Sequence, residues 1–198
     1  MATLTGKHAP DIETTAVVDH KIVHNFSLSQ FKGKQVILFF YPLDFTFVCP
    51  TELHAFQEKL HEFEARNTQV IGCSVDSAYS HLAWLNTPVS KGGIQGVKYP
   101  LIADLNKAFA RSFNVLFEEQ GIAFRGLFLI DANGIIRHQV VNDLPVGRSI
   151  DEVIRTLDAW LYFEQNGEVC PANWSRGKKA MAPNQEGLEK YFATTERN

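Results

Sequence analysis

An uninterrupted apolar run that leads into a proline-bounded loop constrains the fold of this chain more than any other feature. The run Val36-Ile37-Leu38-Phe39-Phe40 is typical of a buried strand. After the loop, Pro50 opens an amphipathic segment that we predict to be a helix, because proline is favoured in the first helical turn. Cys49 is therefore expected where a buried strand gives way, through a loop, to a helix N-terminus.

The position of Cys49 allows two interpretations. The unpaired N–H groups and the positive dipole end of a helix N-terminus favour an anion, and a thiolate is an anion. On this interpretation Cys49 is a reactive nucleophile. The alternative is a small buried hydrophobe, which is a common role of a free cysteine. Position alone does not decide between the two.

Length and composition describe an ordinary globular chain. Its 198 residues suffice for one domain, or for one domain with an appendage. A hydrophobic content of 45% and a charged content of 21% are typical of soluble proteins. The net charge of −3 gives no electrostatic reason to expect nucleic acid or membrane as partners. Without a signal-peptide core or a membrane-length apolar run, we expect a cytoplasmic protein.

The three cysteines, Cys49, Cys73 and Cys170, are few and far apart, which is not the pattern of a disulfide framework. The sequence has no CxxC motif and no paired ligand spacing for zinc, so we expect neither a thioredoxin-type dithiol nor a metal site. In a reducing cytosol a disulfide is more often transient and catalytic than structural. We assign no role to the seven histidines.

Strand and helix patterns alternate along the first 165 residues and predict α/β architecture, with a mixed sheet covered by helices on both faces. From residue 166 onward glycine and proline are frequent, and we predict an extended tail (166–198) outside a domain of residues 1–165. The predicted elements are a hairpin within 11–26, a helical turn at 27–31, a strand at 35–41, a helix at 50–67, a strand at 70–75, a helix at 79–86, a strand at 101–103, a helix at 106–113, a hairpin of strands 126–130 and 135–141, a helix at 150–164 and a closing helix at 188–192.

Three residues could support a nucleophilic Cys49. Arg125 lies in an otherwise apolar strand and could supply a nearby cation, although it could also be a strand-end charge that reaches solvent. Thr46 offers a hydroxyl to a thiolate or a substrate oxygen, or is simply a turn residue. Pro42 could shield the site, or only end the strand.

The pattern Pro42-x-x-x-Thr46-x-x-Cys49 resembles the active-site motif of the peroxiredoxins, and Asp44 to Glu52 is similar to the typical two-cysteine subgroup. The resemblance covers nearly the whole chain, in order. Further matching blocks are Gly72 to Ser77, His81 to Trp84, Asn86 to Pro88, Arg125 to Asp131, Val141 to Ser149 and Gly167 to Trp174.

The resemblance implies a thioredoxin-like fold and a thiol peroxidase that needs no cofactor. It implies that Cys49 is the peroxidatic cysteine, which a peroxide oxidises to sulfenic acid. Thr46 and Arg125 bind and polarise the two peroxide oxygens, and Pro42 limits access of solvent. Cys73 keeps the interpretation of a buried structural cysteine.

The resemblance also implies roles outside the motif. Glu52 and Arg148 orient Arg125, and Cys170 of a second subunit attacks the sulfenic acid to form an intersubunit disulfide. The expected assembly is a homodimer that forms a decamer. A thioredoxin or a flavoprotein disulfide reductase is the expected reductant. Cys49 and Cys170 can meet only if the first turn of the predicted helix unwinds.

In the resembling subgroup, a glycine-rich loop and a C-terminal Tyr-Phe pair slow this unwinding and leave the sulfenic acid exposed to further oxidation. Here the loop contains Gly92 and Gly93 and is one residue longer than the usual pattern, and the pair is Tyr191-Phe192. We therefore hypothesise that Cys49 is sensitive to sulfinic acid formation. Two alternative functions are an oligomeric holdase chaperone with secondary peroxidase activity and a general thiol–disulfide oxidoreductase, against which the missing CxxC argues.

Overall fold

A computed structural model describes residues 3–194 of the protein. By its internal contacts the chain divides into two compact units, one ending at Arg148 and the other beginning at Ser149. The sequence-based boundary after residue 165 stays a prediction.

The first unit is built on a seven-stranded sheet with the strand order β2-β1-β5-β4-β3-β8-β9. Strands β3, β4 and β5 are parallel neighbours, whereas β1 is antiparallel to β5 and β8 is antiparallel to β3. The predicted mixed sheet is therefore confirmed. The strands of this sheet are β1 (Thr14–Val18), β2 (Lys21–Phe26), β3 (Gln35–Phe40), β4 (Thr68–Ser74), β5 (Leu101–Ala103), β8 (Arg125–Ile130) and β9 (Ile136–Asn142).

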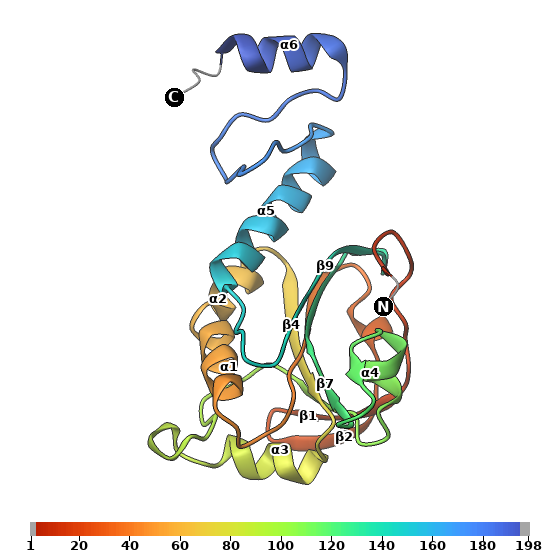
Figure 1. Cartoon of the computed structure of the whole chain (residues 1–198), viewed down its shortest axis with the longest axis vertical. Helices are drawn as coiled ribbons and strands as arrows, with labels where there is room; N and C mark the ends of the chain where they lie inside the picture. Colours follow the sequence, from red (N-terminus) through yellow and green to blue (C-terminus); the bar gives the residue numbers. More distant parts are fainter. Residues whose placement is uncertain (1–2, 195–198) are drawn as a thin grey trace. The chain divides into compact units, whose positions relative to one another are not determined.

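Helices cover both faces of this sheet, as predicted: α1 and α4 lie on opposite sides of it (Figure 1). The remaining short elements connect the strands. The helices of this unit are η1 (Leu28–Phe31), α1 (Val48–Glu58), α2 (Leu60–Glu64), α3 (Ala78–Leu85), η2 (Val89–Lys91) and α4 (Ala108–Ser112), and a separate ribbon pairs β6 (Leu116–Phe117) with β7 (Ile122–Ala123).

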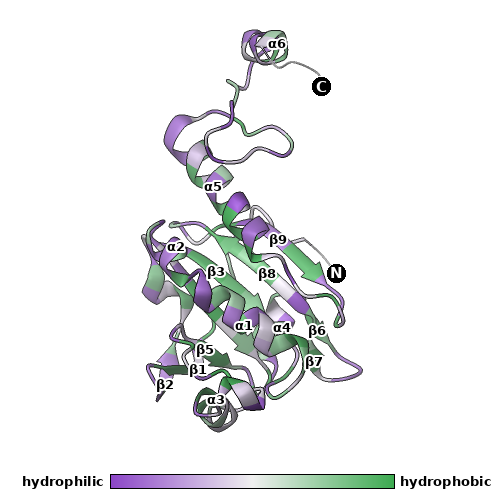
Figure 2. Cartoon of the chain, turned by 90° about the vertical axis from the view of Figure 1, so that its left-hand side faces the viewer, coloured by the Kyte–Doolittle hydropathy of each residue, from purple (hydrophilic) through white to green (hydrophobic). Residues whose placement is uncertain are grey.

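Strand β3 is the centre of the core because all six of its residues are buried. Alternate side chains point to opposite faces of a strand. Phe39 accordingly stacks on Phe56 of α1, with 4.3 Å between ring centroids, while Phe40 packs against Phe113 beyond α4 at 5.4 Å. Figure 2 shows the hydrophobic strands between more polar helices. The apolar run Val36–Phe40 therefore anchors the start of the following loop in the core.

The helix predicted over residues 50–67 is the clearest error in the secondary structure. It consists of two helices, because the backbone leaves helical geometry at Lys59, with φ −100° and ψ 9°. The predicted apolar stripe survives the break, since Phe63 of α2 still lies 6.0 Å from Phe56 of α1. The helix ends at Glu64, three residues before the predicted stop at Asn67, and Asn67 has a positive φ of 49°, which asparagine tolerates.

The second unit contains α5 (Ile150–Asn166), a folded tail and α6 (Gln185–Thr194). Ser149 caps the start of α5 by accepting a hydrogen bond from the backbone of Glu152. After α5, Val169 and Met181 form an isolated antiparallel bridge that closes the intervening tail into a loop. The closing helix predicted at 188–192 is present, and it is longer at both ends.

Candidate active site

Cys49 lies inside the first turn of α1 and is fully buried. The helix begins at Val48, so the start predicted near Pro50 is late by two residues. The N-cap residue Phe47 makes no side-chain capping hydrogen bond. Backbone N–H groups of the first turn therefore remain available to an anion next to the thiol.

Arg125 is the cation beside this thiol. It begins β8, is only 4% exposed, and its Nη1 lies 3.4 Å from the Sγ of Cys49. The same Nη1 donates to Oε2 of Glu52 at 2.8 Å, and Nε donates to the backbone oxygen of Leu144 at 2.7 Å. The alternative interpretation of Arg125, a strand-end charge that reaches solvent, is therefore wrong.

Glu52 joins two arginines, as the sequence resemblance implied. Its side chain is 3% exposed and lies one turn of α1 beyond Val48. Arg148 donates to both carboxylate oxygens of Glu52, from Nε at 2.7 Å and from Nη2 at 2.8 Å, and its backbone N–H adds a third bond at 2.9 Å. Arg148 is itself fixed by donating to the backbone oxygens of Phe40 and Gly126. The Glu52 carboxylate, which Arg148 fixes, therefore orients the Arg125 guanidinium.

The charges of this cluster are unbalanced in a way that favours a thiolate. Arg125 and Arg148 contribute two positive charges, and Glu52 contributes one negative charge, all in side chains less than 5% exposed. A buried excess charge is costly unless an opposite charge lies nearby. The Arg125 guanidinium therefore lies where it would pair with a thiolate at Cys49.

The loop between β3 and α1 carries Pro42 and Thr46. Pro42 is buried, and the Thr46 hydroxyl donates to the backbone oxygen of Leu43 at 2.8 Å. The hydroxyl therefore helps to fold its own loop, as a turn residue does. A role of Thr46 in holding a peroxide, and of Pro42 in limiting solvent, stays a prediction.

A buried polar network that the sequence did not reveal holds the same loop. Asp44 accepts hydrogen bonds from Tyr41 Oη at 2.9 Å and from Ser80 Oγ at 2.8 Å, and its Oδ2 lies 2.8 Å from Nδ1 of His81. The other ring nitrogen of His81 lies 3.1 Å from the backbone oxygen of Ile102. In the sequence His81 was noted only as the first residue of a block that resembles the peroxiredoxins; in the structure it lies on the buried face of α3, with Trp84 and Leu85.

This network shifts the ionisation of its members. Burial alone lowers the pKa of His81, but its hydrogen bond with Asp44, the charge of Asp44 and the Ile102 carbonyl together raise that pKa above its usual 6.5. Burial, followed by the charge of Asp44, raises the pKa of Tyr41 well above its ordinary value. Both ring nitrogens of His81 lie beside oxygen atoms, so the ring links the loop to α3 and β5.

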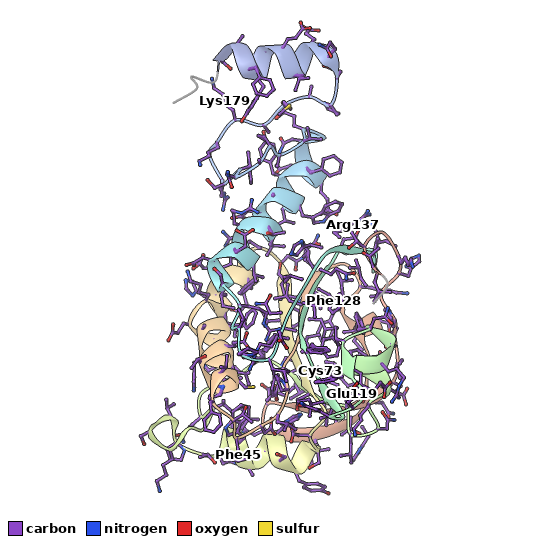
Figure 3. The ribbon with its side chains drawn as sticks, viewed as in Figure 1. Phe45, Cys73, Glu119, Phe128, Arg137 and Lys179 are labelled. Atoms are coloured by element: carbon purple, nitrogen blue, oxygen red, sulfur yellow. The ribbon has the colours of Figure 1, made fainter. Side chains whose placement is uncertain are left out.

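The other two cysteines have different environments. Cys73 is buried in β4 within the apolar core, close to the centre of the sheet (Figure 3). Burial, and then the charge of Asp104, raises the pKa of its thiol well above the usual value. In the second unit, Cys170 is half-buried and its Sγ lies 3.5 Å from the backbone oxygen of Ala159. Burial also raises the pKa of the Cys170 thiol, against the opposing charge of Arg155.

The two predicted regulatory elements belong to different units. The backbone oxygen of Gly92 accepts a hydrogen bond from Trp84 Nε1 at 2.8 Å, and Gly93 is buried. In the second unit, the rings of Tyr191 and Phe192 on α6 are 5.5 Å apart. The structure thus brings Cys49, Glu52, Arg125 and Arg148 together in one cluster.

No cluster of three or more His, Cys, Asp or Glu side chains within residues 3–194 is arranged to hold a metal ion. No helix in the described part of the chain is both long and apolar enough to cross a membrane.

Comparison with known proteins shows to which family the chain belongs. Residues 5–139 match the AhpC/TSA family, and residues 159–194 match the C-terminal domain of 1-Cys peroxiredoxin. The chain therefore belongs to the AhpC/TSA family of peroxiredoxins.

The relatives narrow this class to the two-cysteine subgroup. The chain is 52% identical over 191 residues to the chloroplastic 2-Cys peroxiredoxin BAS1 of Hordeum vulgare, covering 96% of this chain and 90% of that protein. It is 50% identical to a thioredoxin peroxidase of Echinococcus granulosus, covering 98% of this chain and all of the relative. The reduced 2-Cys peroxiredoxin of Plasmodium vivax superposes with a TM-score of 0.94 at 47% identity, over 98% of this chain and 100% of that one. The predicted thioredoxin-like fold is confirmed, and the chain is a thiol peroxidase with an antioxidant role.

Proposed function

We propose that the protein reduces hydrogen peroxide and organic hydroperoxides at Cys49. The Cys49 thiolate attacks the terminal oxygen of the peroxide, the O–O bond breaks, and protonation of the leaving oxygen releases water or an alcohol. Cys49 is left as sulfenic acid. The observation that carries this proposal is the burial of Cys49 in a helical first turn with the Arg125 guanidinium 3.4 Å from its sulfur.

The residues around Cys49 contribute to the reduction of the peroxide in different ways. Arg125 stabilises the thiolate and the charge that develops on the peroxide oxygens, with Thr46 as the second polar contact. Pro42 limits access of water. Glu52 and Arg148 act as positioning residues, because their ion pairs fix the orientation of the Arg125 guanidinium.

Cys170 of a second subunit completes the cycle. Its thiol attacks the Cys49 sulfenic acid, which forms an intersubunit disulfide and releases water. A thioredoxin-like dithiol, or a flavoprotein disulfide reductase, then returns both cysteines to thiols. The functional organisation we propose is a peroxidase domain of residues 1–165 with a tail of residues 166–198 that carries the resolving cysteine. The cycle takes place in the cytoplasm.

Exposed aromatic side chains support assembly beyond a dimer. Phe45, Phe47 and Tyr79 are 53%, 92% and 77% exposed, so their aromatic rings are available to a partner. Phe45 lies over α3, with its ring 5.8 Å from that of Trp84 (Figure 3). We assign this surface to contacts between dimers in a decamer.

A reconstituted peroxidase assay tests the proposal. With thioredoxin, thioredoxin reductase and NADPH, the protein oxidises NADPH at a rate set by added peroxide, and a flavoprotein reductase replaces thioredoxin in a parallel assay. Cys49→Ser and Cys170→Ser abolish turnover, whereas Cys73→Ser retains it. Protection of a client protein from aggregation by Cys49→Ser, without NADPH oxidation by wild type, instead favours the holdase alternative.

The same site is proposed to be sensitive to peroxide itself. Gly92 and Gly93 of the loop, with Tyr191 and Phe192 of the tail, slow the unwinding of α1, so that a second peroxide oxidises the sulfenic acid to sulfinic acid. Mass spectrometry of Cys49 during turnover over a peroxide titration measures this product. The sensitivity hypothesis fails if truncation before Tyr191 leaves the yield of sulfinic acid unchanged.

A further inference from the structure

The segment that carries Cys170 folds back after α5. Gly167 follows the last helical residue with a positive φ of 68°, a left-handed conformation that ends a helix, and its N–H donates to the oxygen of Phe163 at 2.8 Å. The bridge between Val169 and Met181 then closes the following residues into a loop. Cys170 therefore lies in a folded part of the second unit.

One face of α5 holds both ends of residues 168–174, which we call the Cys170 loop. Arg155 and Tyr162 are seven positions apart, or about two helical turns, so their side chains share that face. Tyr162 Oη donates to Oε2 of Glu168 at 2.6 Å, and Arg155 Nη1 donates to the backbone oxygen of Trp174 at 2.7 Å. The loop thus runs along the helix from its C-terminal end toward its first turns.

Trp174 is the firmly held end of this loop. Its side chain is 1% exposed, and its ring lies 5.0 Å from that of Tyr162. Its Nε1 donates to the backbone oxygen of Lys178 at 3.0 Å. Arg155 therefore bonds to a residue that other parts of the second unit also hold in place.

Cys170 lies between the two ends of the loop and has a weaker contact with α5. Its Sγ is 3.5 Å from the backbone oxygen of Ala159, and a thiol is a weak hydrogen-bond donor. Ala159 is four positions after Arg155, so the sulfur lies on the same face of the helix, about one turn away. The sulfur can therefore leave Ala159 while Arg155 and Trp174 stay joined.

The charged and titratable groups that face Cys170 come from α5 and from the loop itself. Arg155 and Tyr162 lie on α5, with Glu152 joined to Arg155 by an ion pair at 2.6 Å, and Glu168 lies on the loop. Burial raises the pKa of the Cys170 thiol, the charge of Arg155 lowers that pKa, and the charge of Glu168 raises it. Within this set, Arg155 is the group that favours a Cys170 thiolate.

We propose that Arg155 is a positioning residue for the resolving step: its bond to the Trp174 carbonyl keeps the guanidinium close to Cys170, where its positive charge favours the attacking thiolate. This inference rests on the proposed function, since it concerns the attack of Cys170 on the Cys49 sulfenic acid. The thiolate is the nucleophile, and the thiol is not. Its sulfur bonds to the Cys49 sulfur, the S–O bond of the sulfenic acid breaks, and the leaving hydroxide takes up a proton to become water.

Four variants separate the charge of Arg155 from a structural role. Arg155→Gln removes the charge, and Arg155→Lys retains the charge without the fork of donors. Glu168→Gln removes the opposing charge of the loop, and Arg176→Ala removes an exposed arginine of the same unit as the matched control.

Two measurements are made on the full-length reduced proteins between about pH 6 and pH 10, a range that brackets the ordinary thiol pKa. The first is the rate at which iodoacetamide alkylates Cys170, resolved by peptide mass spectrometry. The second is the rate of disulfide formation after one equivalent of hydrogen peroxide, followed by rapid quenching. The first reports the thiolate of Cys170 whether or not this cysteine resolves the sulfenic acid.

The expected result is a shift of the pH profile. A nearby opposite charge moves a pKa by about one to three pH units, and Arg155 is 34% exposed and paired with Glu152, so the midpoint of alkylation should rise by about one pH unit in Arg155→Gln. The thiolate fraction at pH 7 then falls about tenfold, and the greater nucleophilicity of a more basic thiolate offsets about threefold of this, so disulfide formation slows about threefold. Above the midpoint the slowing disappears.

The other variants fix the sign of the effect. Glu168→Gln lowers the midpoint, Arg155→Lys keeps it close to that of wild type, and Arg176→Ala leaves it unchanged. The rate of sulfenic acid formation is the same in all four. A midpoint in Arg155→Gln equal to that of wild type overturns the proposal, and so does an equal slowing of disulfide formation at every pH, which a purely structural role would give. Absence of any disulfide in wild type, with the midpoint shifted in Arg155→Gln, overturns the proposed function instead.

Discussion

Replacement of Arg125 tests the electrostatic part of the site. At the 3.4 Å separation of Nη1 and Sγ, an effective dielectric constant of about 20 gives about 5 kcal/mol between unit charges. The same nitrogen is 2.8 Å from a Glu52 oxygen, so part of its charge is already compensated. Loss of one donor to a developing negative charge typically slows a reaction by about 10²- to 10³-fold. We expect a decrease of this size in the rate of Cys49 oxidation in Arg125→Ala.

The assay is a single turnover of reduced protein with hydrogen peroxide, in which sulfenic acid and disulfide are quantified by rapid quenching. Arg125→Lys retains the charge but not the fork of donors that reaches Cys49, Glu52 and Leu144 together. It is therefore expected to fall between wild type and Arg125→Ala. Glu52 keeps its contacts with Arg148, so both variants should remain folded. A folded Arg125→Ala that reacts at a rate close to that of wild type refutes the reasoning.

Three further predictions concern stability. Glu52→Ala leaves two buried guanidinium groups without their carboxylate and should lower the free energy of unfolding by about 3–5 kcal/mol in urea titration, whereas a loss below about 1 kcal/mol contradicts the proposed cluster. Cys73→Ser places a hydroxyl in the apolar core and should cost about 1–3 kcal/mol while peroxidase turnover is retained; loss of turnover in the folded variant argues against a purely structural cysteine. Because folding raises the pKa of His81 above 6.5, this residue adds stability below pH 6.5 that disappears as the pH rises through the folded-state pKa. The difference in unfolding free energy between wild type and His81→Asn should shrink over that range, and a difference independent of pH excludes the charged form.

The sequence was informative where a local pattern decides the structure. The apolar run of β3 and the proline at the start of α1 placed Cys49 to within two residues of its observed helical position. The hairpin predicted from strands 126–130 and 135–141 is present as β8 and β9, and Gly134 in the connecting turn has a positive φ of 82°. Backbone preferences within a few residues are sufficient for such features.

Features that depend on long-range contacts could not be read in this way. Arg125 reaches Cys49 across 76 positions, and Arg148 reaches Glu52 across 96. Only a resemblance to known sequences linked them beforehand. His81 was given no role, because an isolated histidine on a helix face does not reveal that Asp44, 37 residues away, is its partner. The break at Lys59 was equally hidden, since the apolar spacing continues through it.

The most direct test of the central claim is a non-reducing gel of the protein after one equivalent of hydrogen peroxide. The proposed cycle predicts a covalent dimer that disappears on reduction and is absent from Cys49→Ser and from Cys170→Ser. The same band should persist in Cys73→Ser, whose replaced thiol lies buried in the sheet. A wild-type protein that consumes the peroxide but stays monomeric on the gel contradicts the intersubunit Cys49–Cys170 disulfide.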